Sequence, residues 1–64
     1  MVEYNFKRLS ALAKKKGFKL IRIKGSHHQF FNEMTNQFVT IPNHGKRSIP
    51  KGTAQRIIKA LEND

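Results

Sequence analysis

The sequence predicts a small α+β domain with the element order α-β-β-β-α, and three observations support this. Apolar residues recur at helical spacing near each end of the chain. Between them lie three short runs rich in β-forming residues, separated by turn signals. A chain of 64 residues can bury only one core. We therefore expect residues 1–64 to form a single domain, with a three-stranded antiparallel sheet and two helices on one face.

The first helix is expected over roughly residues 5 to 16. Its apolar stripe consists of Val2, Phe6, Leu9, Leu12 and Ala13. Gly17 stands where such a helix would end. The lysines at 14–16 suit a last helical turn, because cations there interact favourably with the helix dipole.

The three predicted strands span residues 18–24, 27–32 and 37–41. The first, FKLIRIK, has apolar residues at both odd and even positions, which predicts that both of its faces are partly covered. Gly25 and Ser26 form a turn signal, and residues 33–36 form a second turn. Pro42 should end the third strand, because proline has no N–H to donate to a sheet.

The second helix is expected after the polar, basic connection at residues 43–49. Pro50 fits its first turn, where the missing N–H does no harm. The residues that share its apolar face are Ala54, Ile57, Ile58 and Leu61.

Composition limits the classes of function. Thirteen Lys and Arg against four Asp and Glu give a net charge of +9, and Glu33 is the only acid between Glu3 and Glu62. Such a chain typically meets a polyanion, most often nucleic acid, although a solvated basic surface is the alternative. Cysteine is absent, and the sequence has neither an apolar run of membrane-spanning length nor a signal-peptide pattern. We expect a cytoplasmic protein with no membrane partner.

Three histidines are the candidate chemical groups. In a regular strand, adjacent His27 and His28 point to opposite faces, and alternation alone leaves open which of them meets solvent. They diverge too far to share one ion with His44, and the few carboxylates are scattered. We therefore expect no metal and no cofactor.

Metal-free RNA cleavage remains chemically feasible. A histidine can take the proton of a ribose 2′-hydroxyl while nearby cations stabilise the developing negative charge. Lys24, Lys46 and Arg47 are candidate phosphate contacts, and a turn at Gly25 would let the backbone approach a ligand closely. As a bare pattern, an exposed histidine in a small basic protein is more often a surface residue or a non-catalytic phosphate contact.

Most of the five phenylalanines must be structural in so small a core. We predict that Phe6, Phe18 and Phe38 are buried. Phe30 and Phe31, which face opposite ways, are the candidates for stacking on an unpaired base.

Four segments in this order carry a family resemblance: residues 17–30, GFKLIRIKGSHHQF; residues 39–44, VTIPNH; residues 49–53, IPKGT; and the predicted helix that bears Ile57 and Ile58. The chain resembles the HicA, or YcfA-like, toxins of bacterial toxin–antitoxin systems. The likeness covers nearly the whole chain. It implies a fold like the double-stranded RNA-binding domain, in agreement with the element order above.

The resemblance also implies a function. HicA-like toxins of type II systems are mRNA endoribonucleases that are neutralised by a HicB antitoxin. The histidine of the glycine-serine-histidine motif is catalytic in the family, which carries over to His27, with His28 as a possible catalytic or auxiliary neighbour. The RNA-contacting set expected from the residues and the resemblance together is Lys24, Gly25, Ser26, His44, Lys46 and Arg47. Two alternatives are a non-catalytic RNA-binding module of the same fold and a module kept for pairing with the antitoxin.

Overall fold

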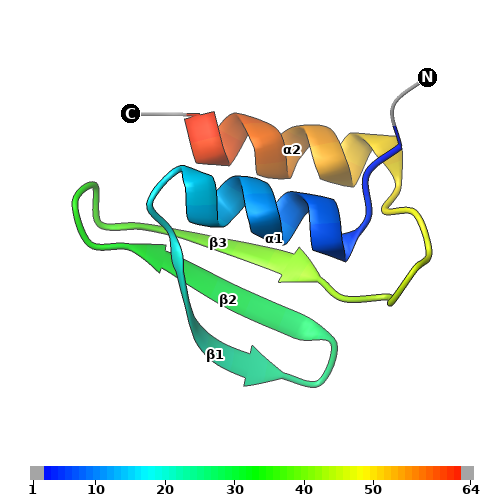
Figure 1. Ribbon diagram of the computed structural model, residues 1–64, viewed down its shortest axis with the longest axis horizontal. Coiled ribbons are helices and arrows are strands. Elements are labelled where there is room, and N and C mark those ends of the chain that lie inside the picture. Colours follow the sequence, from blue (N-terminus) through cyan, green and yellow to red (C-terminus); the bar gives the residue numbers. More distant parts are fainter. Residues whose placement is uncertain (1–2, 63–64) are drawn as a thin grey trace.

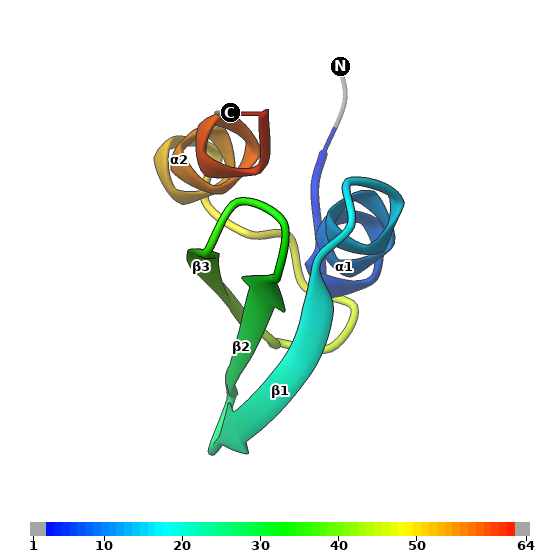
Figure 2. The ribbon, with the colours of Figure 1, turned by 90° about the vertical axis from the view of Figure 1, so that its left-hand side faces the viewer.

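The computed structural model describes residues 3–62 and has the element order predicted from the sequence (Figure 1). The elements are α1 (Phe6–Lys15), β1 (Lys19–Lys24), β2 (His27–Asn32), β3 (Gln37–Pro42) and α2 (Lys51–Glu62). The strands form one antiparallel sheet in the order β1-β2-β3. Both helices lie on the same face of the sheet, and its other face has no helix over it (Figure 2). The predicted fold class is confirmed.

Helix α1 begins and ends as its sequence predicts. The Asn5 side chain caps the first turn by accepting a hydrogen bond from the Arg8 N–H at 2.9 Å. At the other end Gly17 adopts a positive φ of 93°, which allows the Phe18 N–H to donate to the Ala13 carbonyl at 2.9 Å. This is a Schellman-type end, and it turns the chain towards β1 with Phe18 buried.

The core lies between the two helices and the strands β2 and β3. Its buried members are Leu9, Ala13, Phe18, Phe30, Val39, Ile41, Ile49, Ala54, Ile57 and Leu61. Phe6, Leu12 and Ile58 pack against them and are partly buried, so both predicted helical stripes are confirmed, except for Val2, which lies outside the described residues. Pro50 immediately precedes α2, and its carbonyl accepts a hydrogen bond from the Ala54 N–H.

The first strand contributes no residue to the core. No residue of β1 is buried, and its apolar side chains are only partly covered: Leu20 is 42% exposed, Ile21 52% and Ile23 57%. β1 is an edge strand, and the β1–β2 hairpin extends away from α2 (Figures 1 and 2). The buried apolar residues of the sheet, Phe30, Val39 and Ile41, all belong to β2 and β3, so the helices pack mainly over these two strands.

The predicted burial of Phe38 is wrong. Val39 and Ile41 occupy the core-facing positions of β3, so alternation places Phe38 on the helix-free face, where it is 57% exposed. Phe30, one of the two stacking candidates, is 1% exposed in the core and cannot reach a base. The other candidate, Phe31, lies on the helix-free face and is partly buried.

Asn32 has a structural role that sequence inspection missed. It is a buried polar residue, 6% exposed, at the end of β2. Its Nδ2 donates to the Lys16 carbonyl at 3.2 Å, and its Oδ1 accepts from the Met34 N–H at 2.9 Å. One side chain therefore ties the end of α1 to the β2–β3 turn. An asparagine that precedes a turn is a known signal for such side chain to backbone bonds.

Candidate active site

The turn of the β1–β2 hairpin sets the position of His27. Lys24, the last residue of β1, pairs with His27, the first residue of β2, so the turn between them has only two residues. Of these two, Gly25 alone has a positive φ, 59°, as in a type II′ turn. A side chain at position 25 would have space but would be strained by this φ. The conformation therefore requires Gly25, and the Ser26 carbonyl next to it accepts a hydrogen bond from the Asn43 N–H.

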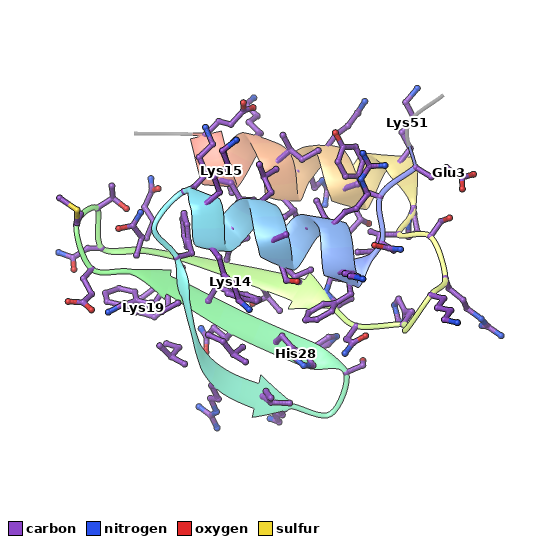
Figure 3. The ribbon with its side chains drawn as sticks, viewed as in Figure 1. Glu3, Lys14, Lys15, Lys19, His28 and Lys51 are labelled. Carbon is purple, nitrogen blue, oxygen red and sulfur yellow. The ribbon has the colours of Figure 1, made fainter. Side chains whose placement is uncertain are left out.

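The two adjacent histidines face opposite sides of the sheet. His27 is exposed on the helix-free face, between Lys24 of β1 and Pro42 of β3. His28, labelled in Figure 3, is half-buried on the other face. Its ring lies 4.5 Å from that of Phe6 in α1, centroid to centroid. The structure thus resolves the alternative that alternation left open, and only His27 is accessible from the helix-free face.

A hollow of about 220 Å³ opens beside His27 on the helix-free face. Its lining residues come from all three strands: Arg22, Lys24, His27, Gln29 and Thr40. Two of the five are permanent cations, one is a histidine and none is acidic. This lining favours an anionic ligand, because like charges gathered around a concave surface reinforce one another's field.

A β-bulge brings Lys19 to the same face as the other two cations of β1. The pairing of β1 with β2 shifts between Leu20 and Arg22, which makes Ile21 an extra residue in the strand. Without the shift, Lys19 and Arg22 would point to opposite sides of the sheet. With it, three cations lie opposite three residues of the helix-free face: Lys19 opposite Phe31, Arg22 opposite Gln29 and Lys24 opposite His27.

The residues predicted from the sequence fall into two groups. Lys24 and His27 line the hollow, with Gly25 and Ser26 in the turn beside it. His44, Lys46 and Arg47 are exposed in the loop after β3 and do not line the hollow. The hydrogen bond from Asn43 to Ser26 attaches the start of this loop to the hairpin turn. The loop is thus a neighbouring basic segment rather than part of the hollow.

Three residues of the hollow were not predicted as site residues. Gln29 and Thr40 form a cross-strand pair on the same face as His27. Gln29 could have been found from the sequence, because it is two residues from His27 in one strand. Arg22 could have been found in the same way, because it is two residues from Lys24 in β1 and the pairing between them is regular. Thr40 required the register between β2 and β3, which has no local sequence signal in this chain.

The acidic groups that the structure describes lie away from the hollow. Glu33 pairs with Lys19 at 3.1 Å at the opposite end of β1, where both side chains are exposed. Glu3 Oε2 accepts a hydrogen bond from the Ser48 hydroxyl, and Glu62 ends α2. In residues 3–62, no three His, Asp or Glu side chains are grouped closely enough to hold a metal ion. The chemically reactive group that the hollow offers is an imidazole flanked by cations.

The fold and the hollow together define a small basic α+β protein whose helix-free sheet face combines a histidine with cations. The family model described as HicA toxin of bacterial toxin–antitoxin systems matches residues 6–62. The chain belongs to the HicA toxin family and is the toxin of a toxin–antitoxin system. A comparison with curated proteins gave no match. No helix within residues 3–62 is both long and apolar enough to cross a membrane.

The inward-facing His28 leads to a stability prediction. Its Nδ1 is buried and has no hydrogen-bond partner among the residues that the structure describes. Such an atom loses its hydration without compensation, at a cost of about 1–3 kcal/mol. We expect His28→Leu to leave the free energy of unfolding unchanged or to raise it, by up to about 1 kcal/mol. Urea denaturation followed by circular dichroism measures this, and a loss of 2 kcal/mol or more would contradict it.

Proposed function

We propose that this toxin is a metal-independent endoribonuclease that cleaves mRNA with His27 at the reacting phosphate. The observation that supports this most directly is the position of the His27 imidazole. It is exposed at the end of a two-residue turn, in a hollow that it shares with Arg22 and Lys24. Membership of the HicA family makes a toxic activity its expected role. A HicB-type antitoxin protein would then neutralise it.

The chemistry follows from the residues of the hollow. The neutral His27 imidazole takes the proton of a ribose 2′-hydroxyl, and the 2′-oxygen attacks the neighbouring phosphorus. The bond from phosphorus to the 5′-oxygen breaks, which leaves a 2′,3′-cyclic phosphate and a 5′-hydroxyl. The leaving oxygen takes its proton from solvent, and the imidazolium returns its proton to solvent. Lys24 and Arg22 stabilise the negative charge that develops on the phosphoryl oxygens.

The direct test is a cleavage assay with purified protein and an end-labelled single-stranded RNA in the presence of EDTA. We expect fragments that end in a 2′,3′-cyclic phosphate. The same sequence with 2′-O-methyl riboses is the control, and it should remain intact because it has no proton to give up. Cleavage of the methylated RNA, or loss of cleavage in EDTA, would refute the mechanism. Binding without any cleavage would instead favour a non-catalytic RNA-binding module.

Lys24 provides a prediction on the electrostatics of binding. Each cation that neutralises a phosphate of a single strand contributes about 0.7 to the slope of log K against log salt concentration. Lys24→Gln should therefore weaken RNA binding and lower that slope by about 0.7. Lys59→Gln, on α2 and away from the hollow, is the matched control and should leave the slope unchanged. Fluorescence anisotropy titrations at several salt concentrations measure the slope. Equal slopes for both variants would show that Lys24 does not contact an RNA phosphate.

A further inference from the structure

An aromatic pair lies on the helix-free face, on strands β2 and β3, which also contribute His27, Gln29 and Thr40 to the hollow. Phe31 of β2 and Phe38 of β3 are cross-strand partners, with ring centroids 4.6 Å apart and planes tilted by 36°. Phe31 is partly buried, whereas Phe38 is 57% exposed. Phe31 therefore supports the Phe38 ring from the side and leaves much of its surface open to solvent. We call Phe31 and Phe38 the aromatic platform.

The platform is continuous with the hollow. Along β2 the residues on the helix-free face are His27, Gln29 and Phe31, and their partners on β3 are Pro42, Thr40 and Phe38. Phe31 is four residues from His27 in the same strand, which corresponds to about 13 Å. A single nucleic acid strand bound at His27 and directed along β2 would pass over Gln29 and reach the platform.

The cations of β1 run parallel to this path. Lys24, Arg22 and Lys19 lie opposite His27, Gln29 and Phe31 in turn, because the bulge at Ile21 keeps all three on one face. An RNA strand whose backbone phosphates lie along β1 would place its bases over β2 and β3. Lys19 also contacts Glu33 at 3.1 Å. Because both side chains are exposed, this ion pair is weak, and Lys19 can leave Glu33 to contact a phosphate.

The surroundings of the platform favour a base over an apolar protein surface as its occupant. The platform is a small aromatic island with Gln29 and Thr40 on one side and a cation of β1 on another. Cores of protein–protein interfaces are depleted in charge and usually form larger apolar patches. Proteins that bind single strands combine a cationic groove with aromatic side chains that stack on bases. The helix-free face has both features.

We propose that the Phe38 ring, supported by Phe31, stacks on an unpaired base of the RNA at a fixed distance from the bond that is cut at His27. This inference rests on the proposed ribonuclease function and adds a requirement to it. The substrate must be single-stranded at the platform as well as at the cut bond, because a base paired in a duplex has no free face to offer. Stacking accepts any base, so the platform selects for unpaired structure more than for sequence.

The first test is RNA binding in a His27→Ala background, where the RNA stays intact. Adding Phe38→Ala should weaken binding of a single-stranded RNA by roughly 5- to 150-fold, and adding Phe38→Trp should not weaken it. Met34→Ala is the matched control, since Met34 is a large exposed apolar residue in the β2–β3 turn, 95% exposed, and lies outside the strands. It should bind like its parent. Because the chain has no native tryptophan, the indole at position 38 also reports stacking directly through quenching of its fluorescence.

The second test locates the stacked base. A series of RNAs is made, each with a single abasic nucleotide at a different position. The affinity of each RNA is measured for two proteins, His27→Ala and the double variant His27→Ala, Phe38→Ala. At one position, we expect loss of the base to weaken binding to the protein that keeps Phe38. At that position the affinity of the protein with Phe38→Ala should not fall. If loss of the base has equal effects on both proteins at every position, the proposed stacking on Phe38 is refuted.

The outcomes separate this inference from the function on which it rests. If the native chain neither binds nor cuts RNA, the proposed function fails and the platform fails with it. If the native chain cuts RNA and Phe38→Ala cuts it equally well, the function stands and the platform is refuted. If Phe38→Ala weakens only the complex with the antitoxin, Phe38 belongs to a protein interface and the inference is overturned. Unchanged thermal unfolding of Phe38→Ala shows that a loss of binding is not a loss of fold.

Discussion

Replacing His27 with alanine is expected to lower RNA cleavage by about 10²- to 10⁴-fold, the usual contribution of a general base. His27 is exposed, and His28, the next residue, contacts the Phe6 ring from the opposite face of the sheet. The substitution therefore removes the proton acceptor of the hollow without opening a cavity in the core. We expect the thermal unfolding midpoint to remain that of the native chain, because surface substitutions away from special contacts have small effects.

Two other histidine variants are matched controls for this result. His44→Ala removes an exposed histidine from the loop after β3, outside the hollow, and should retain most of the activity. His28→Leu removes the inward-facing histidine and should also remain active. The measurement is the initial rate of cleavage of a labelled RNA, together with growth arrest and reporter mRNA loss on induced expression. Full activity of a folded His27→Ala protein, or loss of activity in His28→Leu alone, would remove His27 from the mechanism.

Replacing Phe30 with alanine is expected to unfold most of the protein. Phe30 is 1% exposed and is among the largest fully buried side chains in the described part of the chain. Truncation of a buried Phe to Ala costs about 3–5 kcal/mol, because the loss of buried area adds to the cost of the cavity. A domain of this size rarely has more than about 3–5 kcal/mol of stability from one core. The single change is therefore comparable with the whole free energy of unfolding.

Neighbouring Phe31 provides the control. It is on the opposite face and only partly buried, so Phe31→Ala should cost much less than Phe30→Ala. Circular dichroism at 222 nm and urea titration would compare the two variants. Equal losses of stability would mean that the core does not lie where the structure places it, on the helix side of β2.

The fold was predictable because its main signals are local. Helical spacing of apolar residues, Gly17 at the end of α1 and Pro50 before α2 define the helices within a residue or two. The turn at Gly25 and Ser26 defines the hairpin, and its two-residue length is confirmed. Each of these signals acts through the conformation of a few consecutive residues, so no knowledge of distant contacts was needed.

The predictions that failed depended on distant contacts. Phe38 was expected in the core and is exposed, because the helices cover the face of β3 that carries Val39 and Ile41. The sequence likewise did not show that the apolar residues of β1, which are 42% to 57% exposed, stay outside the core at an edge of the sheet. An alternating pattern shows which residues share a face, but it does not show which face the helices will cover.

The candidate site shows the same division. From composition and motif alone it was possible to infer a basic protein, a histidine pair after a glycine turn, and Lys24 and His27 as neighbours in the candidate site. Only the tertiary structure decided that His27 is the outward histidine, and that Arg22, Gln29 and Thr40 join it in one hollow. The reason is that a hollow lined by three strands depends on how those strands are paired and on which face of the sheet the helices cover. Conformational preferences depend on a few consecutive residues, so the sequence shows them directly. A surface that combines three strands exists only once those strands are paired and packed.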